Sequence, residues 1–275
     1  MKEVLFMKKI LSVTLSIVLL LGLCCGIAFA ADPTVYITIA DKEGKLVLVQ
    51  EPIAVKDIDS DGKITINDAL YCAHESKFSG GAAAGYASEM TDYGLSLKKL
   101  WGIDNGTGYG YYVNNAAAMS LGDEVKDGAY ITAFVYTDTT NWSDTYSYFD
   151  KNTVSVKAGD TVAVQLSALG FDANYNTVVN PVKGATILVN GKATDVKTDD
   201  NGKASVKLSD AGTITISAKS DSQTLVPPAL VVKVAAASGG ESPKTADSTA
   251  VLIFGAVAVI AFAGVVVASR KSARA

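Results

Sequence analysis

The chain has 275 residues, with 24 Lys plus Arg against 28 Asp plus Glu, and a formal net charge of -4. Both Arg residues lie within the last six positions, and residues 31–245 hold 18 Lys and 26 acidic residues, a net charge of -8. A basic patch that could bind nucleic-acid phosphates is therefore not expected, and we predict no nucleic-acid partner.

The start of the chain has the pattern of a secretory signal peptide. Lys8 and Lys9 precede an apolar stretch from Ile10 to Ile27, and Ala28-Phe29-Ala30 supplies the small-x-small pattern that a signal peptidase accepts. Residues 1–30 are therefore predicted to be a signal peptide, an apolar helix that is removed on secretion. The mature chain is predicted to begin at Ala31 and to work outside the cell.

The first folded unit is predicted over residues 31–150 and opens with a hairpin. Apolar side chains alternate along Val35–Ile39, Lys42–Lys45 forms a turn, and Leu46–Val49 is a second β-rich run. Helical spacing then predicts a helix from Ile66 to about Lys77. A weaker helical or irregular stretch is predicted over residues 82–100.

Residues 57–68 form the most chemically specific stretch of the chain. Carboxylates occupy loop positions one, three, five and twelve, and Gly62 at position six permits a sharp turn. Hard cations take several oxygen ligands, and alternate residues of a tightly wound loop point inward to supply them. We therefore predict a Ca²⁺ site whose ligands are the side chains of Asp57, Asp59, Asp61 and Asp68 and the carbonyl of Lys63.

This loop resembles the calcium loop of dockerin modules, which also place Asp at position twelve. A full dockerin carries two such loops and pairs with a cohesin, whereas one loop is present here. The resemblance therefore implies a structural ion rather than a docking surface. The alternative is an acidic turn before a helix, in which Thr65 caps the helix and Asp68 stands at its third position.

Two further strands, Tyr109–Val113 and Tyr130–Tyr136, are predicted after the helix. The succession of hairpin, helix and strands suggests a β-grasp topology, a mixed sheet with one helix across it. On the residues Gly110–Asn115 and Val125–Ile131, the chain resembles the transcobalamin-like C-terminal domain of bacterial surface proteins over about residues 35–137. That resemblance implies a β-grasp domain and raises the hypothesis of ligand binding.

Aromatic residues are dense in this unit, and they include four candidate ligand-binding side chains, Tyr109, Tyr112, Tyr130 and Tyr136. On the last strand, Ile131, Ala133 and Val135 should face one side, and the aromatic residues between them the other. Such rings could form a stacking platform for a corrinoid, a glycan or a peptide. They could equally be cross-strand packing, which aromatic pairs favour.

Catalysis is not expected. Cys72 is the one Cys of the predicted mature chain, so no internal disulfide can form, and His74 is the one His of the whole chain. These two residues are separated by two positions, which point to different sides of a helix, so they do not form a nucleophile and base pair. The chain is therefore predicted to be non-enzymatic.

Residues 151–235 are predicted to be an all-β sandwich. Short β-rich runs alternate with turn signals such as Gly159-Asp160 and Asn190-Gly191. The segments 184–186, 189–192 and 198–204 resemble the corresponding parts of bacterial Ig-like repeat domains. That resemblance implies a spacer that holds a distal domain away from the cell wall.

The end of the chain is predicted to hold it at the surface. Residues 236–249 form a stalk and a short polar motif, residues 250–268 an uncharged apolar helix long enough to span a membrane, and residues 269–275 a basic cytoplasmic tail. This order resembles the sortase sorting signal of Gram-positive surface proteins, with Pro243, Thr245 and Ala246 at the motif positions. The resemblance implies that sortase cuts after Thr245 and joins it to peptidoglycan. An uncleaved membrane helix is the alternative.

The sequence therefore predicts an α+β, β-grasp-like domain followed by an Ig-like β-sandwich, with apolar helices at both ends. The expected function is that of an anchored, non-enzymatic surface protein that binds a ligand or partner through a calcium-stabilised β-grasp domain. The alternative is a structural or adhesive surface protein, which contacts host or neighbouring cells and whose aromatic residues only pack its core.

Overall fold

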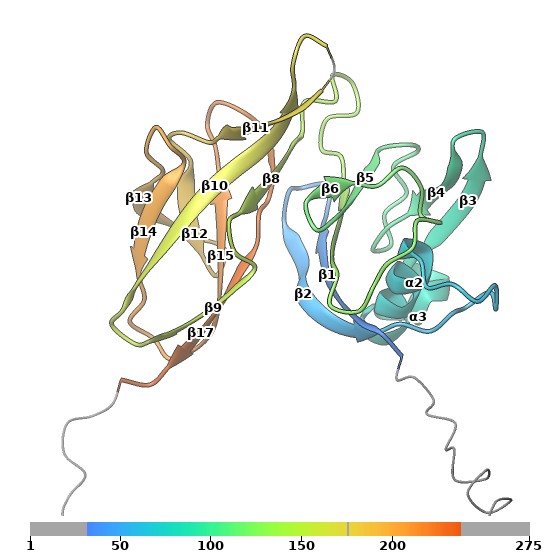
Figure 1. Cartoon of the computed structure of the whole chain (residues 1–275), viewed down its shortest axis with the longest axis horizontal. Helices are drawn as coiled ribbons and strands as arrows, with labels where there is room; N and C mark the ends of the chain where they lie inside the picture. Colours follow the sequence, from blue (N-terminus) through green and yellow to red (C-terminus); the bar gives the residue numbers. More distant parts are fainter. Residues whose placement is uncertain (1–31, 175, 238–275) are drawn as a thin grey trace, which may run out of the picture. The chain divides into compact units, whose positions relative to one another are not determined.

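The structure, a computed structural model, describes residues 32–174 and 176–237 (Figure 1). The predicted signal peptide, sorting motif, apolar span and basic tail lie outside these residues. Within the described part of the chain, no helix is long and apolar enough to cross a membrane.

The amino-terminal domain contains a five-stranded sheet in the order β2-β1-β7-β5-β6. β1 pairs antiparallel with β2 and parallel with β7, and β5 pairs antiparallel with β7 and β6. The predicted hairpin and the two later strands are confirmed. The strands are β1 (Thr34–Ala40), β2 (Leu46–Ala54), β5 (Tyr109–Val113), β6 (Ala116–Ala117) and β7 (Tyr130–Val135).

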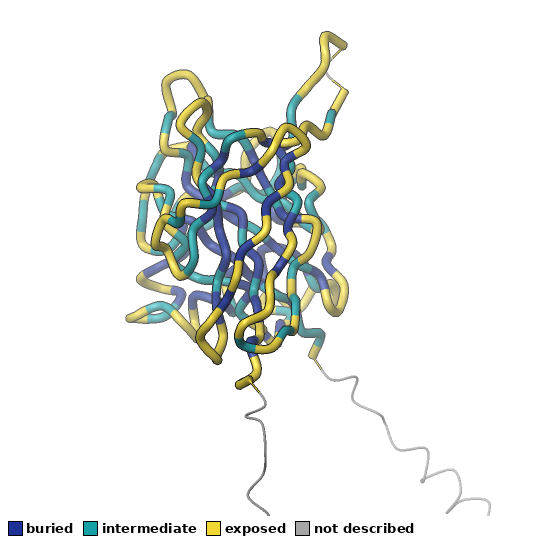
Figure 2. Tube along the Cα trace, turned by 90° about the vertical axis from the view of Figure 1, so that its left-hand side faces the viewer, coloured by how far each residue is buried: buried dark blue, intermediate teal, exposed yellow. Residues whose placement is uncertain are grey.

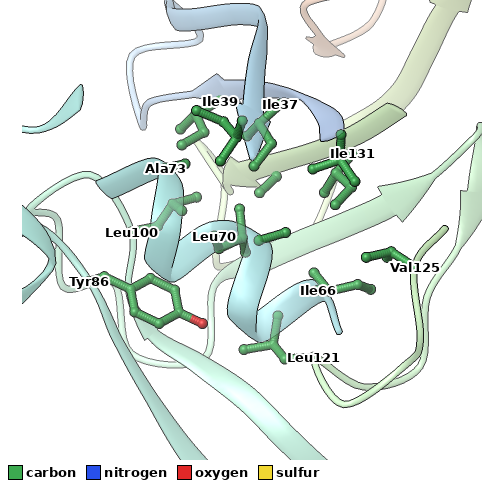
Figure 3. Close-up of a cluster of buried hydrophobic side chains, with 14 of the residues drawn as sticks. Ile37, Ile39, Ile66, Leu70, Ala73, Tyr86, Leu100, Leu121, Val125 and Ile131 are labelled. Carbon is green, nitrogen blue, oxygen red and sulfur yellow. The ribbon is translucent and has the colours of Figure 1, made fainter. Parts of the chain in front are cut away.

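One face of this sheet is covered by helix α2 (Ile66–Lys77), whose predicted bounds are confirmed. Leu70 and Ala73 of the helix are fully buried in the same cluster as Ile37 of β1 and Ile131 of β7 (Figure 3). Ala133 and Val135 belong to this cluster too, while Phe134 belongs to another, so the predicted alternation along β7 is confirmed.

The expectation of a helical or irregular stretch over residues 82–100 is largely wrong. A one-turn helix, α3 (Gly81–Gly85), is followed by a hairpin of β3 (Ala87–Thr91) and β4 (Gly94–Lys99). The turn is possible because Gly94 adopts a φ of 104°, which side chains disfavour. Leu97 is buried in the core while its neighbour Lys98 is exposed, and this is the period of a strand.

The second domain is a β-sandwich, as predicted. One sheet has the order β11-β10-β8-β16 with β14 also paired to β10, and the other has the order β13-β12-β15-β17-β9. Its strands are β8 (Thr145–Phe149), β9 (Thr153–Lys157), β10 (Thr161–Phe171), β11 (Thr177–Pro181), β12 (Thr186–Val189), β13 (Lys192–Lys197), β14 (Lys203–Lys207), β15 (Gly212–Lys219), β16 (Leu225–Val226) and β17 (Leu230–Ala235).

Side chains from both sheets share one core in this sandwich domain. Leu166 of β10, Ile187 of β12, Ile216 of β15 and Leu230 of β17 are all fully buried in it. Buried and exposed residues alternate along the strands, as Figure 2 shows. β8 lies before the expected domain boundary at residue 150, yet it pairs with β10 and β16 of the sandwich.

His74 is a structural residue of the amino-terminal domain. Its side chain is fully buried, with Nδ1 2.6 Å from the Leu70 carbonyl and Nε2 accepting the Trp101 backbone N–H at 2.9 Å. These contacts require the neutral ring with the proton on Nδ1. Burial lowers the pKa of His74, although the Leu70 hydrogen bond acts in the opposite direction. The ring is therefore unavailable as a catalytic base.

We expect the stability of the protein to decrease as pH falls below about 6.5, the ordinary pKa of His. Because the folded state has the lower His74 pKa, the unfolded chain takes up the proton first, and the free energy of unfolding falls by up to about 1.4 kcal/mol per pH unit. Urea unfolding at pH 7.5 and 5.5 measures this change. His74→Gln should be less stable at both values and should show a smaller difference between them. An equal difference in both proteins would contradict the prediction.

Candidate functional site

The acidic loop brings three of its four predicted side-chain ligands together. Carboxylate oxygens of Asp57, Asp59 and Asp61 all lie within 4.8 Å of one another. The sharp turn between them is made by Gly62, which has a φ of 83°. This spacing places several hard oxygen donors around one point at the protein surface, which suits a Ca²⁺ ion.

Asp68, the fourth predicted carboxylate, is 1% exposed and makes a capping box at the start of α2. Its Oδ2 accepts hydrogen bonds from the Thr65 backbone N–H at 2.8 Å and from the Thr65 hydroxyl at 2.6 Å. Its Oδ1 accepts the Ile58 N–H at 3.1 Å, so the same carboxylate ties the entrance of the loop to its exit. The helix-cap alternative is therefore present in the structure, beside the cluster of three acids.

The pKa values of the loop's acids shift in opposite directions. The Gly62 N–H donates to Asp57 at 2.8 Å, and this hydrogen bond is the main reason why the pKa of Asp57 is lowered. The pKa of Asp59 is raised, first by desolvation and then also by the nearby charges of Asp61 and Asp68. A raised carboxyl pKa among like charges means that a positive ion would stabilise the cluster.

The exit of the loop is anchored to the segment that precedes β7. The Ile66 N–H donates to the Asp123 carbonyl at 3.1 Å, and the Val125 N–H donates to the Ile64 carbonyl at 2.8 Å. Lys63, whose carbonyl is a predicted ligand, places its Nζ 3.2 Å from Glu124. The exit of the loop is thus held by a segment distant in sequence, whereas its entrance is held by Asp68 of the loop itself.

The four predicted ligand-binding tyrosines do not form one site. Tyr109 packs against the helix-covered core, and its hydroxyl lies 2.8 Å and 2.9 Å from the carbonyls of Lys98 and Ile103. Tyr130 stacks on Tyr36 across the β1–β7 pair, with ring centroids 4.7 Å apart. Only Tyr112 and Tyr136 share a cluster.

That cluster, which we call the aromatic junction, joins side chains from both domains. Tyr112 of β5 stacks on Tyr146 of β8, with centroids 3.7 Å apart and an interplanar angle of 6°. Burial raises the pKa of Tyr112. The buried members of the junction are Ala40, Phe134, Tyr146 and Val226, and Leu46, Tyr112, Tyr136, Tyr148 and Leu169 pack against them.

Polar contacts accompany the aromatic junction. The Tyr146 hydroxyl donates to the Asn115 side chain at 2.9 Å, and the Gln50 side-chain amide donates to the Ala229 carbonyl at 2.9 Å. The sequence did not predict the contacts of Tyr146 and Gln50, because each residue bonds to a partner far along the chain. The sequence around Tyr146 does indicate a strand, because Tyr146 and Tyr148 are two positions apart in a β-rich run and would face the same side.

No family model matches this chain, and no curated protein matches its sequence. Among solved structures, it is similar to the teleost fish polymeric Ig receptor ectodomain, with 14% identity, a TM-score of 0.20, and coverage of 50% of this chain and 66% of the receptor chain. It is also similar to the four N-terminal Ig domains of Dscam1 isoform 9.44, with 13% identity, a TM-score of 0.21, and coverage of 74% and 46%. The chain thus spans 66% and 46% of the lengths of these two chains.

Calcium should stabilise the protein through Asp57, Asp59 and Asp61. An ion present at a hundred times its dissociation constant adds about 2.7 kcal/mol to the free energy of unfolding, which raises Tm by roughly 10 °C in a domain of this size. Calorimetry in Ca²⁺ and in EDTA measures the shift. The Asp59→Asn, Asp61→Asn double variant should lose it, whereas Asp200→Asn, which alters an exposed acid elsewhere, should keep it. A Tm that EDTA leaves unchanged would rule out the ion.

The Tyr112–Tyr146 stack should contribute to stability. Each single substitution to Ala is expected to lower the free energy of unfolding by about 3 kcal/mol, and a double-mutant cycle should give a coupling of about 1 kcal/mol. Tyr93→Ala, at a 90% exposed aromatic, is the control and should change stability by less than about 0.5 kcal/mol. Additive effects of the two junction substitutions would mean that the rings do not interact.

Proposed function

We propose that this chain is a non-enzymatic cell-surface protein of the structural or adhesive kind. In this proposal, a calcium-stabilised β-grasp domain is carried by an Ig-like β-sandwich and displayed outside a Gram-positive cell. The aromatic junction is the observation that favours a structural or adhesive function over ligand binding by the tyrosines. Tyr112 and Tyr136, which the ligand-binding alternative needs in an open site, instead pack against Tyr146 and Val226 of the same chain.

The strand order supports the β-grasp assignment. The first and last long strands, β1 and β7, are parallel neighbours in the middle of the sheet, with β2 and β5 outside them and α2 across one face. A right-handed crossover through a helix is the usual way to join parallel strands in one sheet. This arrangement agrees with the resemblance to transcobalamin-like domains over residues 35–137.

The pairing in the sandwich supports the Ig-like assignment. In Ig domains, the first, second, fourth and fifth strands share one sheet, and the third, sixth and seventh share the other. β8, β10 and β14 correspond to the first, second and fifth strands, and β12, β15 and β17 to the second group, while β13 pairs with β12 and departs from the pattern. An Ig-like domain in this position would act as a spacer between the amino-terminal domain and the cell wall.

Display at the surface is supported by the sequence of the two ends. The signal-peptide pattern leads the chain out of the cell, and Pro243, Thr245 and Ala246 precede an apolar stretch and a basic tail. Sortase and peptidoglycan are the proposed partners of this segment, together with the membrane that the apolar stretch would span. The buried, fully hydrogen-bonded His74 supports the non-enzymatic part of the proposal.

Surface display can be tested in a Gram-positive host that has a sortase. Protease added to intact cells should remove both folded domains from the wild-type chain, and boiling in detergent should leave the chain attached to the wall. Thr245→Ala should abolish wall attachment because it removes the joining residue, whereas Ser248→Ala, outside the motif, should not. Cells that display the wild-type chain should also clump or attach to neighbouring cells more than cells carrying Thr245→Ala. Domains protected from protease, or display without any gain in attachment, would contradict the proposal.

A further inference from the structure

The loop between β7 and β8 is held in one conformation by two of its own carboxylates. Asp138 accepts hydrogen bonds from the Thr140 and Asn141 backbone N–H groups at 3.0 Å and 2.9 Å, and from the Ser143 hydroxyl at 2.8 Å. These contacts, the Asn141 N–H foremost, lower the pKa of Asp138 to about 2. Asp144 accepts from both N–H and hydroxyl of Thr137 and from the Asp138 N–H.

This ordered loop presents Trp142 to solvent in a strained backbone conformation. The φ of Trp142 is 55°, a left-handed value that is unfavourable for a bulky residue. Its N–H donates to the Asp138 carbonyl at 3.1 Å. Trp142 is 48% exposed, and its ring stands edge-on to Tyr136, with centroids 5.1 Å apart and an interplanar angle of 73°.

Trp101, the other Trp of the chain, has a similar φ of 50° but an evident structural reason for it. Its backbone N–H donates to Nε2 of the buried His74 ring at 2.9 Å. Its indole packs against His74 and Phe78 inside the domain. Trp142 satisfies no buried group of this kind, and the residue is half exposed. Strain that packing does not account for is a reason to look for a ligand.

We propose that Trp142 and its loop form a carbohydrate-binding platform that takes one ring of a neutral glycan. A rigid, half-exposed indole offers an apolar face for a sugar ring and loses little conformational entropy when it binds. The Asp138 carboxylate stays ionised because its pKa is lowered to about 2, so the loop carries this negative charge as well as uncharged hydroxyls and amides. The hydroxyls and amides belong to Thr139, Thr140, Asn141 and Ser143. Hydroxyl, amide and carboxylate groups are hydrogen-bond partners of sugar hydroxyls, and the negative charge of Asp138 disfavours an anionic ligand.

This site is distinct from the four tyrosines and from the acidic loop. Trp142 was not among the predicted ligand-binding residues, and no contact of its loop involves Asp57, Asp59 or Asp61. Glycan binding should therefore persist in EDTA. The test of calcium binding and the test of glycan binding can therefore fail independently of each other.

The full chain, ¹⁵N-labelled and kept in a detergent without a sugar headgroup, should be titrated with maltohexaose, cellohexaose and chitohexaose. The chain has two Trp residues, so Trp142→Phe assigns both indole N–H signals. At least one hexaose should shift the Trp142 signal saturably, with a Kd on the order of 1 mM, and should leave the Trp101 signal in place. Trp142→Ala should weaken binding about tenfold or more, Trp142→Phe less, and Tyr93→Ala not at all.

Three results would overturn the proposal. The first is the absence of a saturable shift with all three hexaoses at concentrations about tenfold above 1 mM. The second is a Trp142→Ala variant that keeps its folded spectrum and binds as the wild type does. The third is tighter binding of hexagalacturonate, which has carboxylates on similar rings, because a preference for an anion contradicts a site beside the Asp138 carboxylate.

Discussion

The parallel pairing of β1 with β7 is the contact on which the amino-terminal domain depends. Residues 36–40 pair in unbroken register with residues 130–134, nearly a hundred positions later in the chain. Since side chains alternate across a strand, this register sends Ile37 and Ile131 toward α2 and places Tyr36 and Tyr130 together on the other face. A shift of one residue would exchange the two faces, so one register decides both the core and the outer surface.

The outer face of that sheet explains the aromatic density of the sequence. Phe134, Tyr112 and Tyr136 would form a large exposed apolar patch on an isolated domain, and such patches are unfavourable in water. The stack of Tyr112 on Tyr146 covers the patch with the chain's own next strand. The four tyrosines that suggest a binding platform in the sequence thus have packing partners, whereas Trp142, which is not one of them, is half exposed.

The acidic loop shows how a surface site can be prepared by the fold around it. Asp68 links the loop entrance to the first turn of α2, and the backbone bonds of Ile64 and Ile66 fix the loop exit. A loop that is held at both ends loses less conformational entropy when an ion binds. The same contacts explain why a helix-cap role and a metal-site role for this stretch are compatible: Asp68 serves the cap while the three other acids converge.

Features that depend on near neighbours could be predicted from the amino-acid order. These are the bounds of α2, the alternation along β1 and β7, the convergence of Asp57, Asp59 and Asp61 within five residues, and most strands of the sandwich. Tertiary structure alone decided that residues 87–99 form a hairpin, that β8 belongs to the sandwich, and that Tyr146 is the partner of Tyr112. The physical reason is that periodicity and capping act over a few residues, whereas strand pairing and ring stacking select among partners from the whole chain by the surface they bury.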